Sequence, residues 1–401
     1  MMSTSAPDRL THLDALRGFA LMGIALVNYQ VFASAYYGSG FPQPGFDTVW
    51  DRATLLALAV FFEAKFYLLF SFLFGYSFYL QMQAAERAGA AFGARMGRRL
   101  AGLAALGLAH GLLFFQGDIL LAYALFGLVL LACRHWPPRR ALRVALALIV
   151  LGMLPWLLLG LLSNPEEADP LSWQEAYAHI QAQITAYRGP VSEVIAQHWH
   201  DLSREVWLAE LFGQGPGAMA MFLVGLALAK RQALHAPWTH RAALRALAWL
   251  ALPLGLAGAV FYGVVSAPGA TWQMTLLALA IGMLTAPLLS LAYVCLFMLA
   301  WGRPRGARVL GWLAPAGRMA LSNYLLQSVA GAWLFTGWGL GLIDRVGPPA
   351  ALGLALLVFV AELAVSAWWM RRHAYGPVEW GLRCLTQGRR VPWRRQGAAA
   401  S

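Results

Sequence analysis

Ten apolar runs, each close to the length of a helix that crosses a lipid bilayer, dominate this chain of 401 residues. A hydrocarbon core about 30 Å thick takes roughly 20 helical residues. Only 12% of the residues are charged, against roughly 25% in a soluble domain, which excludes a soluble fold, a disordered chain and a disulfide scaffold. We therefore expect an all-α, polytopic membrane protein that forms a single transmembrane domain over residues 1–401. The predicted spans are 13–34, 53–80, 98–115, 118–133, 141–163, 206–229, 242–265, 271–300, 309–337 and 349–370.

The basic residues fall mainly on one side of the predicted membrane. The sequence carries 30 Lys and Arg against 18 Asp and Glu, a net charge of +12, and the basic residues lie between the apolar runs. This arrangement points to membrane topology and not to a nucleic-acid partner. By the predicted spans, 23 basic residues lie on the side of the two termini, four on the opposite side and three within spans. Because positively charged loops stay in the cytoplasm, we expect a multi-pass protein of the bacterial inner membrane with both termini cytoplasmic.

Two segments are predicted to lie outside the spans. Residues 164–205 should be extracytoplasmic, and their mixed apolar and polar residues predict amphipathic helices from Trp173 to Tyr187 and from Val191 to Trp207. Residues 371–401 form a basic cytoplasmic tail that suits contact with anionic lipid headgroups. We predict no metal site, because the neighbouring His198 and His200 lack other clear ligands.

A polar stripe follows the first span. Asp14, Arg17 and Asn28 share one helix face with two apolar residues, at alternating spacings of three and four. Asp14 and Arg17 would lie at the cytoplasmic end and Asn28 nearer the outer leaflet. Two interpretations remain open for the charged pair: an interfacial ion pair that stabilises the helix end, or a grip on a ligand phosphate.

Further ionisable residues map to the outer half of the membrane at the depth of Asn28. They are Glu63 and Lys65 in the second predicted span, His110 in the third, and Asp118 in the turn that follows. Structural salt bridges or a satisfied core histidine would explain each residue singly. Together they supply the base, carboxylates and cation that a proton-transfer site needs. We therefore predict that all five residues line one cavity.

The last two spans carry a second set of polar residues. Arg318 and Asn323 lie in the span at 309–337, and we expect them to contribute to substrate binding. Glu362 lies in the last span and needs a cation, for which Arg318 and Lys65 are the only buried candidates.

Several motifs resemble those of a known family. RLTHLDALRGFALMGIALVNYQVF, FFEAKFYLLFSFLFGYSF and HGLLFFQGDILLAYALFG resemble the bacterial YeiB-like membrane proteins, the family of the domain of unknown function 418. GRMALSNYLLQS and GPVEWGLRCLT are similar to that family's closing pattern, and the match is collinear over almost the whole chain. The LDALRG opening also looks like that of transmembrane acyltransferases, which include the acyltransferase 3 proteins and heparan glucosaminide N-acetyltransferase.

The second resemblance implies a reaction. Those acyltransferases take an acyl group from a cytoplasmic acyl thioester and place it on an external or luminal sugar, and Asp14, Arg17 and Gly18 match their opening motif. Acyltransferase 3 members carry a histidine late in the first helix, where this chain has Asn28. The resemblance thus implies that another base, His110, has taken over, or that acyl transfer has been lost.

These observations lead to competing hypotheses. The first is an acyltransferase with acyl-coenzyme A as donor substrate, no tightly bound cofactor, a cell-envelope acceptor, and His110 as general base oriented by Asp118 or Glu63. Arg17 and the cytoplasmic arginines would meet the phosphates of the donor. The second is a transporter in which Glu63, Lys65, His110 and Glu362 form a proton relay. A non-catalytic membrane factor is the third, and association into a homo-oligomer stays open.

Overall fold

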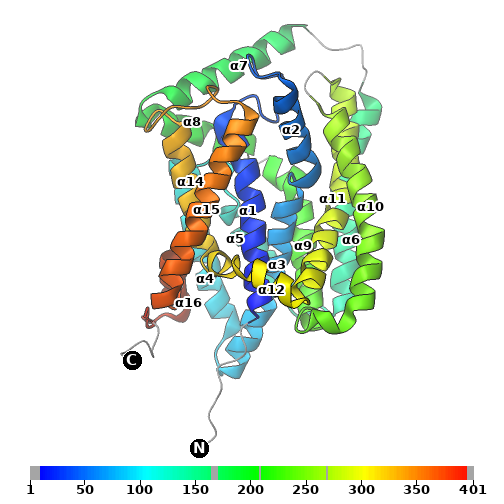
Figure 1. Cartoon of the computed structure of the whole chain (residues 1–401), viewed down its shortest axis with the longest axis vertical. Coiled ribbons are helices and arrows are strands. Elements are labelled where there is room, and N and C mark those ends of the chain that lie inside the picture. The colour runs from blue at the N-terminus through cyan, green and yellow to red at the C-terminus, as the bar shows by residue number, and fades with distance from the viewer. Residues whose placement is uncertain (1–9, 164–169, 207–208, 268–269, 395–401) are drawn as a thin grey trace, which may run out of the picture.

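The computed structural model describes residues 10–163, 170–206, 209–267 and 270–394, which form a bundle of helices (Figure 1). Its first half contains α1 (Thr11–Ala33), α2 (Val49–Phe61), α3 (Lys65–Arg87), α4 (Phe92–Leu113), α5 (Leu120–Ala132), α6 (Pro138–Leu162), α7 (Pro170–Arg188), α8 (Val191–Asp201), η1 (Leu202–Val206) and η2 (Ala209–Gln214). The second half contains α9 (Gly215–Lys230), η3 (Pro237–His240), α10 (Arg241–Val265), α11 (Trp272–Trp301), α12 (Pro304–Gly311), α13 (Ala314–Arg318), α14 (Ala320–Phe335), α15 (Pro348–Arg372) and α16 (Pro377–Gln387).

The all-α, polytopic prediction is confirmed. Among the described residues, seven helical segments are long and apolar enough to cross a membrane: Thr11–Ala33, Val49–Arg87, Pro138–Leu162, Phe212–Lys230, Pro237–Val265, Trp272–Trp301 and Pro348–Arg372. They correspond to seven of the predicted spans. The other three predicted spans correspond to α4, α5 and α14; α5 has 13 residues and α14 has 16. The count of ten spans stays a prediction.

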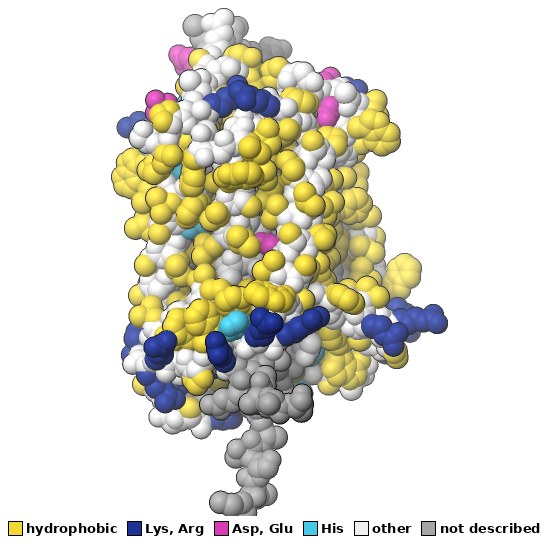
Figure 2. All heavy atoms as spheres, turned by 60° about the vertical axis from the view of Figure 1, so that its left-hand side comes forward, with side chains coloured by type: hydrophobic (Ala, Val, Ile, Leu, Met, Phe, Trp, Pro, Cys, Tyr) yellow, Lys and Arg dark blue, Asp and Glu magenta, His cyan; other side chains and the backbone are white. Residues whose placement is uncertain are grey.

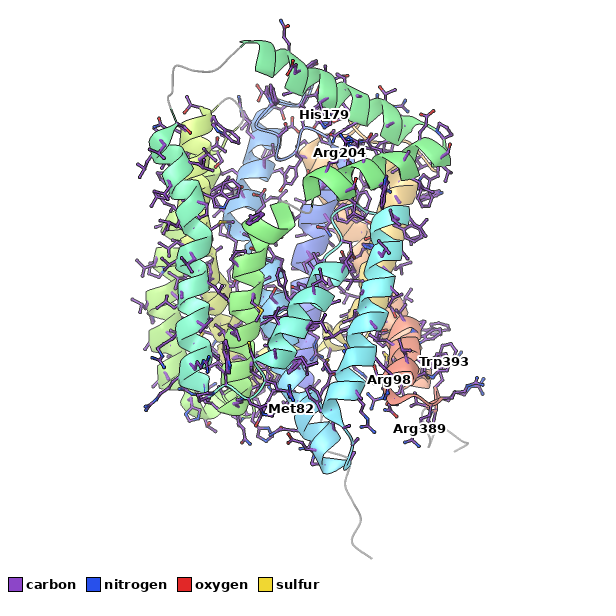
Figure 3. The ribbon with its side chains drawn as sticks, turned by 180° about the vertical axis from the view of Figure 1, so that it is seen from behind. Met82, Arg98, His179, Arg204, Arg389 and Trp393 are labelled. Carbon is purple, nitrogen blue, oxygen red and sulfur yellow. The ribbon has the colours of Figure 1, made fainter. Side chains whose placement is uncertain are left out.

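The two ends of the bundle differ in structure. Helices α7 and α8 lie across the upper end in Figure 1, whereas α16 lies at the lower end, where α1 also begins. Figure 2 shows an apolar band with Lys and Arg side chains gathered along its lower edge. Figure 3 labels Arg98 and Arg389 at this lower end and His179 at the upper end. An apolar band with a basic edge is the surface expected of a polytopic membrane protein.

The second predicted span, 53–80, is wrong as a continuous helix. Helix α2 ends at Phe61 and α3 begins at Lys65, with Ala64 between them at φ 63°, a left-handed conformation that is uncommon for alanine. Side chains satisfy carbonyl groups around the break: Tyr293 Oη donates to the Phe61 oxygen at 2.8 Å, and Ser290 Oγ to the Lys65 oxygen at 2.7 Å. Such partners allow a helix to break within a membrane.

The ninth predicted span, 309–337, is also discontinuous, because α12, α13 and α14 follow one another around α1. A close crossing with α1 explains where α13 lies. A Cβ atom built on Gly317 would lie 1.7 Å from the Asp14 carbonyl oxygen, and one on Gly18 would lie 2.3 Å from the Leu313 oxygen. Only glycine permits this approach of two backbones.

The segments outside the spans are folded as well. Helices α7 and α8 occupy the region where two amphipathic helices were predicted, and His198 Nδ1 donates to the Leu112 oxygen at the end of α4. In the predicted basic tail, α16 is followed by a chain that folds back, so that the rings of Trp380 and Trp393 stack with centroids 4.7 Å apart. The tail therefore contains a packed helix that sequence reasoning did not predict.

Acidification should weaken the upper end. His198 is buried, and this burial lowers the pKa of its imidazole to about 4, against about 6.5 in an unfolded chain. The unfolded state therefore binds the proton first, and stability falls as the pH drops below 6.5 towards 4. At pH 5 the loss should be about 2 kcal/mol relative to pH 7. Thermal unfolding of the purified protein in detergent at both pH values measures it.

The matched control is a histidine that is exposed on α7. His198→Gln should reduce the difference between the two pH values, whereas His179→Gln should leave it as in the wild type. An unchanged pH dependence in His198→Gln would contradict this assignment.

Candidate functional site

Within the described part of the chain, one cavity enters the upper half of the bundle and another enters the lower half. The upper cavity has a volume of about 480 Å³, and its polar and charged lining residues include Asn28, Glu63, Lys65, Gln116, Gln214 and Thr285. The lower cavity has a volume of about 380 Å³, and its lining includes Arg17, Ser77, Gln81, Arg99, Arg318 and Glu379. Both cavities are otherwise lined mainly by apolar side chains, so the charged residues dominate their electrostatics.

Ile24 and Ile119 line both cavities, so these two side chains mark where the cavities approach each other. The predicted stripe of α1 continues past this point. Arg17 and Ile24 line the lower cavity, and Ile24 and Asn28 line the upper one. At 1.5 Å per residue, the stripe from Arg17 to Asn28 is roughly 16 Å long, about half the thickness of a hydrocarbon core.

Basic residues surround the lower cavity. Arg17 Nη1 donates to Asp14 Oδ1 at 2.7 Å, as in the interfacial ion pair considered above, and Arg17 Nη2 donates to Ser77 Oγ at 2.6 Å. Arg318 Nη2 donates to the Ala374 oxygen at 3.3 Å. Arg99 on α4 also lines the cavity. Three guanidinium groups in one largely apolar cavity favour an anionic ligand.

A carboxylate from α16 faces the same cavity. Glu379 Oε1 accepts hydrogen bonds from the backbone N–H groups of Leu321 and Ser322, at 2.7 and 3.0 Å, and Oε2 accepts one from Ser322 Oγ at 2.5 Å. Glu379 thereby satisfies N–H groups in the first turn of α14, which have no partner within the helix. Sequence reasoning missed Arg99 and Glu379, although Glu379 lies within the GPVEWGLRCLT motif.

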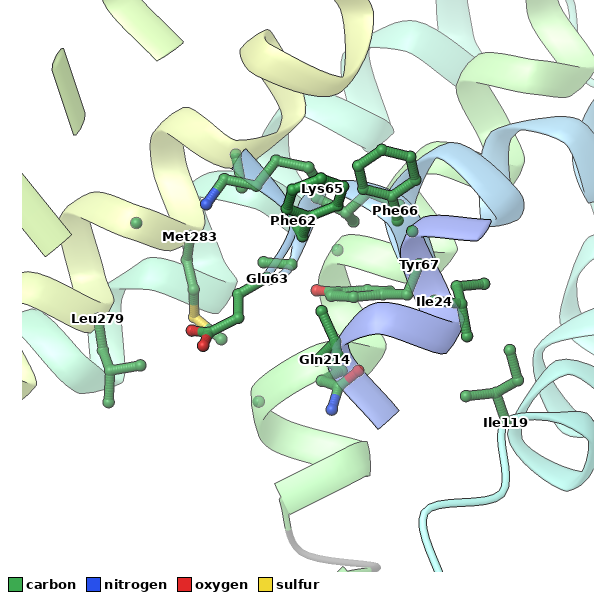
Figure 4. A pocket seen from close by; sticks show the side chains of 18 of the residues that line it. Ile24, Phe62, Glu63, Lys65, Phe66, Tyr67, Ile119, Gln214, Leu279 and Met283 are labelled. Carbon is green, nitrogen blue, oxygen red and sulfur yellow. The ribbon is translucent and has the colours of Figure 1, made fainter. Parts of the chain in front are cut away.

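The upper cavity contains Glu63 and Lys65 on either side of the break at Ala64 (Figure 4). Glu63 accepts a hydrogen bond from Tyr37 Oη. Lys65 Nζ instead donates to the Ala59 oxygen at 2.5 Å and lies 6.0 Å from the centre of the Tyr262 ring. The two charged residues share the cavity but have separate partners.

His110 and Asp118 are close together but line neither cavity. Nδ1 of His110 lies 2.8 Å from Oδ1 of Asp118, and Asp118 Oδ2 accepts from the Leu121 N–H at 2.8 Å. The prediction of one cavity shared by all five residues is therefore wrong. The predicted contact between His110 and a carboxylate is present, and it involves Asp118.

The dyad of His110 and Asp118 is next to Ile119, one of the two residues that line both cavities. Asp118 precedes Ile119, whose N–H donates to Tyr324 Oη at 3.4 Å, and the rings of His110 and Tyr324 are 5.0 Å apart. An ionised Asp118 could only accept, so a neutral His110 paired with it would carry its proton on Nδ1 and have a lone pair at Nε2. Within the described part of the chain, Nε2 has no hydrogen-bond partner.

Comparisons with known proteins place this architecture in a family. Residues 228–389 match the family model described as "Protein of unknown function (DUF418)". The chain is 32% identical to the "Uncharacterized protein YxaH" of Bacillus subtilis (strain 168), covering 96% of each protein. It is 30% identical to the "Uncharacterized protein YeiB" of Escherichia coli (strain K12), covering 94% of this chain and 96% of that protein. The chain belongs to the DUF418 family.

The remaining predicted residues of this DUF418 protein have structural partners. Glu362 Oε2 accepts from Gln327 Nε2 at 2.7 Å, and no ion pair involves Glu362 in the described part of the chain. The prediction that a cation pairs with Glu362 is therefore wrong, because the neutral amide of Gln327 is its partner. Asn323 Nδ2 donates to Ser366 Oγ at 2.9 Å, which links α14 to α15, and Asn323 lines neither cavity.

The buried dyad should be measurable as a coupling free energy. Asp118→Asn and His110→Gln each remove the charge-assisted contact, and the double variant should lose less stability than the sum of the two. We expect a coupling of about 2 kcal/mol, typical of a buried hydrogen bond to a charged group. Thermal unfolding of the four proteins in detergent measures it.

The control cycle uses a surface pair. Asp47 and Arg52 lie 3.4 Å apart but are mostly exposed, so Asp47→Asn with Arg52→Gln should show almost no coupling. Equal coupling in the two cycles would contradict a special role for the buried dyad.

Proposed function

We propose that this DUF418 protein is a membrane acyltransferase that moves an acyl group from a cytoplasmic acyl-coenzyme A to an extracytoplasmic acceptor. The observation that carries the proposal is the turn formed by Asp118 and Ile119. Ile119 lines both cavities, and Asp118 holds His110 in place behind it. A donor in the lower cavity and an acceptor in the upper cavity would thus meet beside a candidate general base.

The donor suits the lower cavity. Its three arginines match the phosphate groups of coenzyme A, and its apolar inner wall suits the remainder of a bound thioester. The resemblance of the LDALRG opening to transmembrane acyltransferases supports the same assignment, because Arg17 lies in that motif and lines the cavity.

The chemistry needs one base and no covalent enzyme intermediate. His110 Nε2 accepts the proton of an acceptor hydroxyl while the hydroxyl oxygen attacks the thioester carbonyl carbon. The tetrahedral intermediate then expels the coenzyme A thiolate as the carbon–sulfur bond breaks, and that thiolate takes the proton from His110. An ester and free coenzyme A result. Asp118 holds the imidazole in the required tautomer and stabilises its protonated form. Neither residue lines a cavity, so His110 reaches the reacting atoms only once the side chains of the Ile119 wall move.

The orientation in the membrane completes the proposal. The protein lies in the bacterial inner membrane with both termini in the cytoplasm, so that the lower cavity faces coenzyme A and the upper cavity faces the cell envelope. The basic edge at the lower end supports this orientation.

A transporter is the second candidate, and the broken helix between α2 and α3 favours it. Discontinuous helices with charged residues at the break form the substrate sites of many transporters. Glu63 and Lys65 flank such a break and line a cavity. In that case the two cavities would be the two halves of a pathway that Ile24 and Ile119 close.

Donor binding distinguishes the candidates. Acetyl-coenzyme A or a longer acyl-coenzyme A should raise the melting temperature of the purified protein and lose its acyl group to water or to an added acceptor. Arg17→Ala should weaken binding by at least about tenfold, because a charged hydrogen-bonding group is lost. His110→Ala should bind the donor almost normally and lose about 10²- to 10⁴-fold in transfer rate.

Two surface variants serve as controls. Arg345→Ala and His240→Ala remove exposed side chains, and both should bind donor and transfer the acyl group as the wild type does. No stabilisation of the wild type by any acyl-coenzyme A up to millimolar concentration would reject the acyltransferase, and the transporter would then lead.

The orientation has its own test. After residue 401, a reporter that works only in the cytoplasm should be active and one that works only in the periplasm should be inactive. A reporter inserted in the segment 164–169 should give the opposite result. Periplasmic activity of the C-terminal fusion would reverse the proposed topology.

A further inference from the structure

The upper cavity contains two opposite charges that do not neutralise each other directly. Among its described lining residues, Glu63 is the only carboxylate and Lys65 the only Lys, Arg or His. Within the described part of the chain, no basic nitrogen forms an ion pair with Glu63. Since a charge inside a membrane is expensive unless it is paired or has a function, this separation requires an explanation.

The local backbone keeps the two charges apart. The break at Ala64 separates Glu63 from the start of α3, and the charged ends of the two side chains lie apart (Figure 4). Tyr37 Oη donates to Glu63, and the Ala59 oxygen accepts from Lys65 Nζ. Tyr262 is near both charges, since it interacts with Glu63 and its ring centre lies 6.0 Å from the Lys65 ammonium.

The surroundings of both charges suit a ligand. The other polar side chains of the cavity include the neutral amides of Asn28, Gln116 and Gln214. These groups can donate and accept but bring no net charge. Phe62 and Phe66, near Lys65, provide apolar surface in the same cavity. The cavity thus combines one carboxylate, one ammonium group and neutral walls.

We propose that the upper cavity binds a small zwitterion, with its ammonium group on Glu63 and its carboxylate or phosphodiester group on Lys65. A ligand of net charge zero leaves the cavity neutral and pairs both charges, whereas a ligand with one charge leaves the other unpaired. This inference does not depend on the proposed function. The zwitterion would be the acceptor of an acyltransferase or the solute of a transporter.

Three probes with the same aromatic body test the charge requirement. They are L-phenylalanine, 2-phenylethylamine and 3-phenylpropionate at pH 7, and glycerophosphoethanolamine serves as a zwitterion whose anion is a phosphodiester. Binding is measured as the concentration dependence of the melting temperature of the full chain in detergent. At least one zwitterion should bind with a Kd about tenfold or more below those of the amine and the acid.

Two conservative variants should exchange the preference. Glu63→Gln should lose affinity for the amine-bearing probes and favour 3-phenylpropionate, while Lys65→Gln should favour 2-phenylethylamine. A gain for one probe cannot come from misfolding, so the exchange remains informative if a variant is less stable. Asp51→Asn, which changes a buried acid outside both cavities, should keep the wild-type order.

Several outcomes would overturn the proposal. They are no binding of either zwitterion up to millimolar concentration, equal binding of all probes, or an unchanged order in both variants. Stabilisation by acyl-coenzyme A, measured on the same proteins, reports on the lower cavity, so failure here is distinguishable from failure of the proposed function.

Discussion

The backbone N–H and C=O groups cannot remain without partners inside a membrane, and this constraint governs where the bundle is regular and where it is not. Most of the chain meets it by forming helices. Where α2 ends and α3 begins, Tyr293 and Ser290 hydrogen-bond to carbonyl groups at the break. At the start of α14, the Glu379 carboxylate from α16 accepts hydrogen bonds from two backbone N–H groups. Both irregular sites lie beside a cavity, so the departures from regular structure coincide with the places where a ligand could bind.

Helix α1 organises both cavities because its two ends contact different partners along one face. Gly18 and Gly317 let α13 approach the lower part of α1, which brings Arg17 and Arg318 to one cavity. Farther along the helix, Asn28 reaches the upper cavity. The glycine of the LDALRG motif and that of the GRMALSNY motif therefore act as a pair, since a methyl group on either would collide with the other segment's backbone. This contact gives a physical reason for motifs that lie about 300 residues apart in the sequence.

Hydropathy and helical periodicity predicted most of the architecture, because they depend on local spacing. They placed seven of the ten predicted spans, the two helices at the upper end and the polar face of α1. They could not predict the breaks at Ala64 and before α14, since the partners that stabilise each break come from distant helices. Position along a span placed His110 and Glu63 at the same depth in the membrane. It could not predict where each residue lies around the axis of the bundle. Asp118 is in contact with His110, whereas Glu63 lines a separate cavity.

Three groups of charges within the bundle differ in what a ligand could do to them. His110 and Asp118 bond to each other and are shielded from both cavities. The arginines of the lower cavity outnumber its one lining carboxylate, so this cavity attracts anions. Glu63 and Lys65 balance each other in the upper cavity without touching. An enzyme that transfers a group from an anionic donor in the lower cavity to a polar acceptor in the upper cavity would need separate charge groups in the two cavities. Each substrate would then be recognised in its own cavity. The turn at Asp118 and Ile119 adjoins all three groups, because Asp118 bonds to His110 and Ile119 lines both cavities.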